Sequence, residues 1–401
     1  MKAKLRQVRT TNTARIIDAL RQSPNQTVKA ISEETQLSRA TVTKILTNLR
    51  SQSVVEEVGV GVSTLEGGKP PKLYTFNPQA KWLIGMHLSG ETLFGKLVDL
   101  NINPIAEVTA HIPREIGDQE LLDAMESAIR ALLADGELSW SDLLGIGIGT
   151  PGVTDLFRGA VIHSPHNPSW GHDFHLRDLV LHRIRETRTV YVDNAIRFRT
   201  IAERDLGVLQ GVKDGVVVHC DEGLIAGVLL DGVIRRGFNN LAGSVGHMTI
   251  NPADTLRCDC GGYGCFEMQV KPTRVLDRFV HDLSTTPHSE LSSRDPASLS
   301  IGDLFHAAET GDPTARTVMQ EVAQWFAVGL HNLILAYDPE LVVIQGTYAT
   351  AGEYFRTELI RQVESVSLLG APMKTRVLCS SLGEDAASLG AASYALSQAF
   401  V

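Results

Sequence analysis

The sequence lacks any apolar run that approaches the roughly 20 residues needed to cross a bilayer. Its amino-terminal segment also lacks the apolar core and the small-residue cleavage site of a secretory signal. We therefore expect a cytoplasmic protein with no membrane association. Cysteine is scarce, with five in 401 residues. In a reducing cytoplasm, clustered thiols indicate a metal rather than a disulfide.

An overall positive charge is missing too, because the formal net charge is −9, which taken alone argues against nucleic acid as a partner. The charge is distributed unevenly, however. Residues 1–75 contain 12 lysines and arginines but only 6 acidic residues, a net +6, which leaves −15 for residues 76–401. A basic head on an acidic body indicates a small anion-binding module joined to a part with another task.

Three amphipathic helices are expected in the first 50 residues. The first follows Thr13 as its N-cap, the second ends at Gln36, and the third follows the N-cap Ser38. In the third helix the apolar residues recur at i, i+3, i+4 and i+7, namely at Val42, Ile45, Leu46 and Leu49. Two short helices separated by a tight turn are typical of a helix-turn-helix.

The polar face of the third helix predicts contacts to DNA through Arg39, Thr41, Thr43 and Lys44, whose short hydroxyls and cations suit base edges and phosphates. Alternating residues at Val54–Val60 and Leu73–Phe76 then predict a β-hairpin wing. Lys69 lies between glycines and proline at the expected tip, where it could approach a phosphate. A helical dimerisation domain is the alternative interpretation of this module.

From Lys81 onward, strands and helices alternate in two successive sets, which indicates a two-lobed α/β fold of the ribonuclease-H-like, actin/hexokinase type. We place a winged helix-turn-helix at residues 1–80. The first lobe is expected at 81–195, joined by a C-terminal helix at 384–401. The second lobe, with a dimerisation surface, is expected at 196–383.

Several segments of the chain resemble the ROK family (repressors, open reading frames, kinases), on its repressor branch. They are the GGKPP wing, GIGTPG, the VDNA segment and the stretch AGSVGHMTINPADTLRCDCGGYGCFE. With the winged module, they span nearly the whole length. The resemblance implies a sugar-kinase-like body behind a DNA-binding head.

A metal site is expected in the last of these stretches. Cys258, Cys260 and Cys265 lie within eight residues, and His247 lies eleven residues upstream. Three thiolates and one imidazole supply the closed four-ligand shell of a structural zinc, with Zn–S bonds near ~2.3 Å. We therefore expect one zinc ion per chain with no catalytic role. Buried free thiols or a disulfide are the alternatives.

The resemblance also implies a set of ligand-binding residues. In the family, the glutamate matched by Glu267 and the histidine matched by His247 help to define a sugar pocket. Asn167 lies in a segment that resembles the pocket wall. Ser244 stands where sugar-binding members have a glutamate, which weakens the expected grip on sugar hydroxyls. Asp193 and Asn194 complete the ligand-binding prediction.

Phosphoryl transfer is not expected. The family's kinases have an Asn-Asp pair where this chain has Asp193-Asn194, so an amide stands at the position of the general base. Two phosphate loops also differ, with His87 and Glu91 in the first and Asp221 and Glu222 in the second. The glycine pair near the nucleoside position is replaced by Ile344-Gln345-Gly346-Thr347. An early end of the strand, with Asp193 turned inward, is the alternative.

These observations together predict a repressor that binds an inverted-repeat operator in double-stranded DNA as a homodimer or tetramer and responds to a sugar or sugar phosphate. It would be a regulator of carbohydrate-related genes and not an enzyme. Two alternatives stay open. One is an active sugar kinase with a DNA-binding head, and the other is a regulator controlled by a protein partner.

Overall fold

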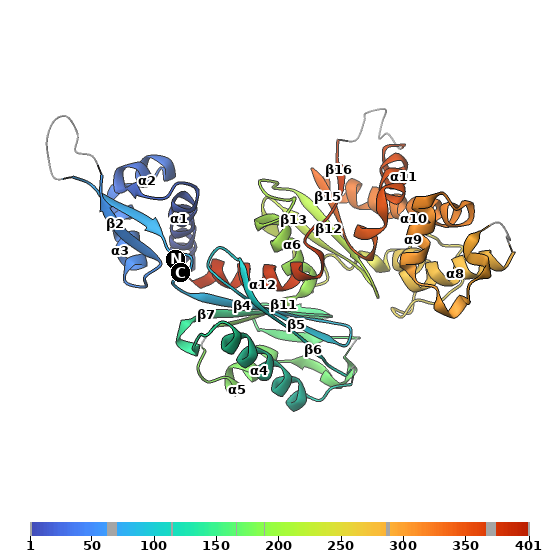
Figure 1. Cartoon of the computed structure of the whole chain (residues 1–401), viewed down its shortest axis with the longest axis horizontal. Coiled ribbons are helices and arrows are strands. Elements are labelled where there is room, and N and C mark those ends of the chain that lie inside the picture. The colour runs from blue at the N-terminus through green and yellow to red at the C-terminus, as the bar shows by residue number, and fades with distance from the viewer. Residues whose placement is uncertain are drawn as a thin grey trace. The chain divides into compact units, whose positions relative to one another are not determined.

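The computed structural model describes residues 2–61, 70–113, 115–165, 167–187, 189–285, 289–365 and 374–399 (Figure 1). The chain divides into two compact units. Unit 1 comprises Met1–Ala195 together with Ala391–Val401, and unit 2 comprises Ile196–Gly390. None of the helices in the described part of the chain combines the length and apolarity needed to span a membrane.

Unit 1 begins with a winged helix-turn-helix. Its helices are α1 (Lys2–Gln22), α2 (Val28–Thr35) and α3 (Arg39–Arg50), and its three-stranded sheet has the order β1-β3-β2. The strands are β1 (Gln26–Thr27), β2 (Val55–Val60) and β3 (Lys72–Phe76). Buried residues of all three helices form its core, among them Leu20, Ile31 and Leu46.

The predicted start of the first helix was wrong. Helix α1 begins at Lys2, so Thr13 lies inside the helix and is not its N-cap. Thr13 precedes Ile16, Ile17 and Leu20 at helical spacing and is buried with them, which makes it part of the inner face. The N-cap predicted at Ser38 is confirmed, since its side chain accepts from the Thr41 amide. Helix α2 has Thr27 as its N-cap, a residue that the sequence analysis did not name, and Thr27 accepts from the Ala30 amide.

The rest of unit 1 is built on a five-stranded sheet of order β11-β7-β4-β5-β6. These strands are β4 (Trp82–Ser89), β5 (Thr92–Val98), β6 (Pro104–His111), β7 (Leu143–Thr150) and β11 (Val190–Asn194). Helices α4 (Asp118–Asp135) and α5 (Leu176–Arg183) pack on one face (Figure 1). The carboxyl-terminal part of α12 (Ala386–Ala399) packs on β7, where a Cβ at Gly147 would lie 2.2 Å from the Ala391 carbonyl oxygen.

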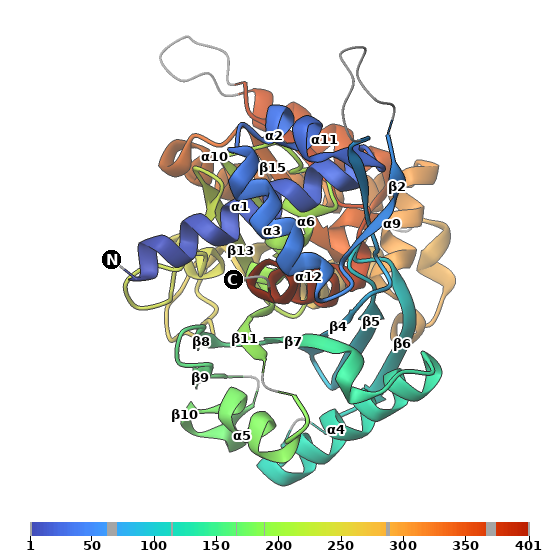
Figure 2. The ribbon, with the colours of Figure 1, turned by 90° about the vertical axis from the view of Figure 1, so that its left-hand side faces the viewer.

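A small antiparallel sheet follows β7, with the order β10-β9-β8. Its strands are β8 (Val153–Asp155), β9 (Ala160–His163) and β10 (His172–Phe174). Figure 2 shows the three strands side by side near α5. Strands β9 and β10 enclose residues 164–171, which contain Asn167 and Trp170.

Unit 2 repeats the same sheet plan with the order β14-β13-β12-β15-β16. The strands are β12 (Gly215–Cys220), β13 (Leu224–Leu230), β14 (Val233–Ile234), β15 (Leu341–Gly346) and β16 (Arg376–Cys379). In each unit an antiparallel hairpin is extended by two parallel strands: β5-β4 by β7 and β11, and β13-β12 by β15 and β16. This repetition is the two-lobed kinase-like fold predicted from the sequence.

Helices cover both faces of the second sheet. On one face lie residues 196–205 of α6 (Ala195–Asp205), where a Cβ at Gly227 would clash with the Thr200 hydroxyl. The core on the other face is formed with α7 (Phe266–Val270), α8 (Pro272–Thr285), α9 (Ile301–Thr310), α10 (Pro313–Tyr337) and α11 (Gly352–Glu364). An aromatic cluster lies at its centre, where Phe326 and Phe355 both contact Tyr348.

Candidate DNA-binding, metal-binding and ligand-binding sites

The exposed face of α3 is the candidate DNA-reading surface. The helix buries Val42, Ile45, Leu46 and Leu49 against the module's core. Arg39, Thr43 and Lys44 are exposed on the opposite side. Within the described residues neither Arg39 nor Lys44 forms an ion pair, so both charges are available to a phosphate or a base edge.

The two threonines of this prediction differ. The Thr41 hydroxyl lies 2.9 Å from the Ser38 hydroxyl, so the half-buried Thr41 helps to form the start of the helix. The hydroxyl of the exposed Thr43 donates to the Arg39 carbonyl at 2.8 Å. Asn48, which the sequence analysis did not name, is also exposed, four residues after Lys44 on the same helix face.

The wing is present as the β2–β3 hairpin. Lys72 and Arg50 both pair with Glu57, at 2.8 and 3.0 Å, and Arg50 lies over the Tyr74 ring. These contacts fix the hairpin to the end of α3. Lys69, the residue predicted at the wing tip, lies outside the described residues.

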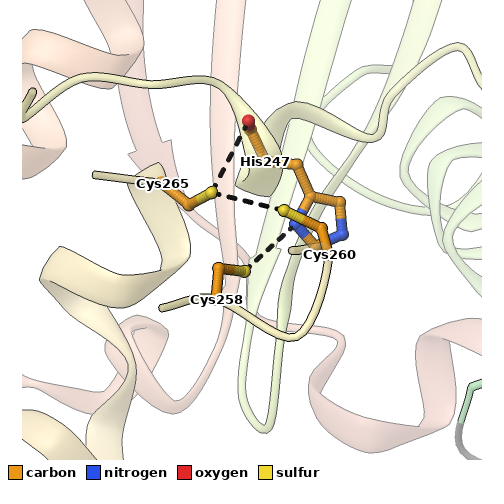
Figure 3. Close-up of side chains that lie close together, drawn as sticks. All are labelled: His247, Cys258, Cys260 and Cys265. Carbon is orange, nitrogen blue, oxygen red and sulfur yellow. Dashed lines mark hydrogen bonds between the residues drawn. The ribbon is translucent and has the colours of Figure 1, made fainter. Parts of the chain in front are cut away.

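The structure brings all four predicted metal ligands together (Figure 3). One ring nitrogen of His247 and the Sγ atoms of Cys258, Cys260 and Cys265 lie within 4.8 Å of one another. Cys258 Sγ is 3.6 Å from His247 Nδ1, and Cys260 Sγ is 3.6 Å from Cys265 Sγ. Tetrahedral ligands at ~2.3 Å from a zinc ion lie about 3.8 Å apart, so the donor set and its spacing fit this ion.

A tight loop creates this convergence. Isolated bridges pair Thr249 with Cys265 and Arg257 with Tyr263, and they fold the segment back beside His247. Gly264 has a φ of +67°, and a Cβ there would lie 2.0 Å from the Asn251 carbonyl oxygen. Only glycine fits such a position, so the loop requires it to bring Cys265 toward the other ligands.

Glu267 lies directly beside the cluster. Its Oε1 accepts from the Cys258 thiol at 3.0 Å and is 3.3 Å from His247 Nδ1. Burial raises the pKa of Glu267, but the hydrogen bonds from His247 and Cys258 outweigh it and hold that pKa at about 2. The same contact with Glu267 raises the pKa of His247, and burial raises that of Cys258. Glu267 is therefore negatively charged beside these residues.

The predicted ligand-binding residues belong to different units. Ser244, His247 and Glu267 belong to unit 2, where the Oε2 atom of Glu267 accepts from the Leu224 amide at 3.4 Å. Ser244 is half-buried and His247 is exposed. Asn167, Asp193 and Asn194 belong to unit 1 and are buried there.

Strand β11 continues through Asn194, so it does not end before the Asp193-Asn194 pair. Asp193 is fully buried and accepts from the Thr154 hydroxyl at 2.9 Å and from the Asn194 amide at 2.8 Å. The side-chain amide of Asn194 donates to the Gly152 carbonyl at 2.5 Å. The Asp193 carboxylate therefore acts as a hydrogen-bond acceptor, and the side-chain amide of Asn194 acts as a donor.

The residues that the resemblance aligns with phosphate loops differ in their surroundings. His87 is buried in β4 and stacks on Phe94 at 4.7 Å, while Glu91 is exposed in the following turn. Asp221 accepts from the Thr347 amide at 2.7 Å, from the Thr347 hydroxyl at 2.6 Å, and from His219 at 2.8 Å. Its pKa is held at about 2, because the contacts with His219 and Thr347 outweigh the effect of burial.

Comparison with known proteins agrees with this architecture. The ROK family profile matches residues 83–398, and the IclR helix-turn-helix domain matches residues 10–59. A xylose repressor of Caldicellulosiruptor bescii is 28% identical over 362 residues, which cover 90% of this chain and 89% of that protein. A glucokinase of Halalkalibacterium halodurans is 27% identical over 315 residues, 77% of this chain and 93% of that protein.

The solved structures give the same result for the fold. The crystal structure of a ROK family transcriptional regulator, a homologue of the E. coli MLC protein, superposes with a TM-score of 0.84 at 23% identity and covers 98% of both chains. The match therefore includes the winged module as well as both lobes. With a family match over most of its length, the chain belongs to the ROK family.

Proposed function

We propose that this protein is a DNA-binding transcriptional repressor of carbohydrate-related genes that senses a sugar or sugar derivative and does not transfer phosphate. The observation that carries the proposal is the combination of Arg39 and Lys44, which are exposed on α3 and form no ion pair with any described residue, with a body that belongs to the ROK family. The full-length similarity to a xylose repressor supports the same function.

The DNA would be read by α3 in the major groove, with Arg39 on a base edge and Lys44 on a phosphate. Thr41 and Thr43 would contribute their methyl groups to this surface, since their hydroxyls already have partners within the helix start or backbone. A two-fold dimer would present two such helices to an inverted repeat. Such a protein acts in the cytoplasm.

Salt dependence tests this placement. Lys44→Ala should reduce the slope of log affinity against log salt by about 1 and weaken specific and non-specific binding alike, because one phosphate contact is lost. Lys213→Ala is the matched control, because it removes an exposed lysine of unit 2. An unchanged slope in Lys44→Ala, or an equal change in Lys213→Ala, would contradict the role of α3.

The residues proposed to bind an effector are Asn167, Asp193 and Asn194 in unit 1 and Ser244, His247 and Glu267 in unit 2, each set taken within its own unit. Xylose is the first sugar to test, because it is named in the repressor relative. A sugar present at 100 times its dissociation constant should stabilise the protein by roughly 2.7 kcal/mol. Glu267→Gln should abolish that shift in a thermal melt, while Glu384→Gln should retain it.

The cluster of His247, Cys258, Cys260 and Cys265 would hold a structural zinc ion. When bound, zinc would cross-link the loop after β14 to the start of α7. The chain's own Glu267, two residues after Cys265, would be oriented by that cross-link toward the Leu224 amide. Four protein ligands leave no position for a reacting water, so the ion supports folding and not chemistry.

Sugar kinase activity is the second candidate function, because a glucokinase is among the relatives. The internal contacts of Asp193, Asn194 and Asp221 argue against it. A coupled ADP-release assay with glucose, xylose and their amino derivatives separates the two functions. Sugar-dependent ADP release above a no-enzyme control would favour the kinase.

A further inference from the structure

Two histidines face each other at the neck of the loop that contains Asn167. His163 ends β9 and His172 begins β10, and the two residues are direct partners in the antiparallel pairing of these strands. Their rings stack with centroids 5.0 Å apart and planes inclined by 22°. Both residues are exposed. The pair therefore joins the two ends of residues 164–171 at the surface of unit 1.

The neighbouring His175 shows what distinguishes this pair. His175 Nε2 is 3.5 Å from the Asp173 carboxylate and 3.3 Å from an Arg158 nitrogen, so its ring is already held by charged groups. Within the described residues, by contrast, the ring of neither His163 nor His172 forms a hydrogen bond or an ion pair. Each ring can therefore offer a nitrogen lone pair to a ligand.

We propose that His163 and His172 form a second metal site, distinct from the cysteine cluster, that binds a divalent transition-metal ion such as zinc, nickel or copper. Imidazole suits these ions. Directly opposed strand positions also place the two Cβ atoms only about 4.5–5.5 Å apart, within reach of a shared ion. Exposed rings change rotamer rapidly, so both can turn out of the stack and direct one nitrogen to the same ion.

The site differs from the cysteine cluster in kind. Two neutral imidazoles leave most coordination positions of the ion to water, whereas the cluster supplies four ligands, three of them thiolates. The histidine pair therefore binds more weakly and exchanges its ion. It responds to the metal available in the surroundings and does not act as a permanent part of the fold.

The position of the histidine pair links metal binding to the segment between β9 and β10. The enclosed loop contains Trp170, which is buried and stacks on Phe174 of β10 at 5.4 Å, and Asn167, which is also buried. An ion that bridges His163 and His172 closes this loop at its base and lowers its conformational freedom. Metal binding thus stiffens the segment that contains Asn167. Only this last link rests on the proposed function, because the metal site itself does not depend on Asn167 binding an effector.

Nickel titration of the full-length, zinc-loaded protein tests the site. Calorimetry should show binding of Ni²⁺ without release of zinc, accompanied by a change in fluorescence that Trp170→Phe removes. His163→Ala and His172→Ala should each weaken Ni²⁺ binding by roughly ten-fold or more, because one imidazole replaces two. His175→Ala is the matched control from the same segment and should bind as the unmodified protein does.

Absence of Ni²⁺ binding to the unmodified protein, or equal binding by the His163 and His172 variants, would overturn the proposal. Equal weakening in His175→Ala would do so too, because it would indicate diffuse binding by the histidine-rich segment. His163→Gln and His172→Gln retain polar side chains at exposed positions and serve if an alanine variant does not fold. DNA binding measured on the same samples reports separately on the proposed function.

Discussion

The two units share one sheet plan but use the carboxyl ends of their strands differently. In unit 1, Asp193 at the end of β11 is fully buried and bonded by Thr154. In unit 2, Asp221 just after β12 is bonded by Thr347, but its side chain remains 30% exposed. In both units an aspartate at or just after the end of a strand accepts a hydrogen bond from a threonine of its own unit. The difference is that one carboxylate is sealed and the other reaches solvent.

Unit 2 also holds the candidate four-ligand cluster of His247, Cys258, Cys260 and Cys265, and the described part of unit 1 has no group of three or more such ligands. The largest effect is therefore expected there. Cys258→Ser should lose the metal, which we expect at about one equivalent per chain, because three ligands no longer close the shell. The free energy of unfolding should fall by several kcal/mol, since metal binding and local folding are coupled.

Metal analysis and chemical denaturation measure both quantities. Cys379→Ser is the control, because Cys379 is half-buried in β16 and is not part of the cluster. Full retention of metal by Cys258→Ser would exclude the four-ligand site. Metal affinity should also decrease as the pH is lowered, since protons compete for the thiolates and for His247.

The next effect is expected at the sealed carboxylate of unit 1. Asp193→Ala removes a buried carboxylate that accepts from the Thr154 hydroxyl and the Asn194 amide, which should cost about 1–3 kcal/mol. Asp193→Asn should cost less, because its carbonyl oxygen can still accept. Urea denaturation measures both, with Asp123→Ala on the exposed side of α4 as control. An Asp193→Ala variant as stable as that control would refute the buried network.

A smaller effect is expected in unit 2. Asp221→Asn should cost on the order of 1 kcal/mol at neutral pH, because water can reach the site and replace part of what is lost. The pKa of Asp221 is lowered from 3.8 to about 2, so the carboxylate stabilises the folded protein above pH 3.8. The difference in stability between the two proteins should stay constant down to that pH and shrink as the pH falls toward 2. A difference that shrinks already near neutral pH would contradict this assignment.

Local sequence patterns predicted the helices and strands of both units. They did not predict the side-chain contacts by which the two units differ. The cap at Ser38 and the spacing of the metal ligands are features of a few neighbouring residues, and both are found in the structure. Asp193 and Thr154 are 39 residues apart, and Asp221 and Thr347 are 126 apart. Such pairs depend on how strands are ordered in the sheet, which no periodicity encodes.

The same limit explains what was wrong or missing at the ends of elements. The start of α1 was placed at Thr13 because a threonine before an apolar run is typical of an N-cap. The structure places it on the inner face of a longer helix. The pairing of His163 with His172 was equally invisible, because it depends on the register of β9 against β10.

The last comparison concerns substitutions that restore kinase-type residues in the two units. We expect a single such substitution to produce no kinase activity. Asn194→Asp restores a carboxylate at the position of the general base, yet ADP release should stay at the background level. The Asn194 amide donates to the Gly152 carbonyl at 2.5 Å. A carboxylate there would face that oxygen without a proton to share, so it would be misplaced for catalysis as well as destabilising.

In that variant unit 2 would still not accept a nucleotide, because Asp221 still accepts hydrogen bonds from the amide and the hydroxyl of Thr347. A carboxylate about 4 Å from a phosphate oxygen costs on the order of 4 kcal/mol at an effective dielectric near 20, so nucleotide binding should stay undetectable. Only Asn194→Asp combined with Asp221→Gly and Glu222→Thr should begin to bind ATP, as measured by calorimetry. ATP binding by the unmodified protein would show that the contacts of Asp221 do not prevent unit 2 from binding nucleotide. ADP release by Asn194→Asp alone would show that one residue separates this regulator from a kinase.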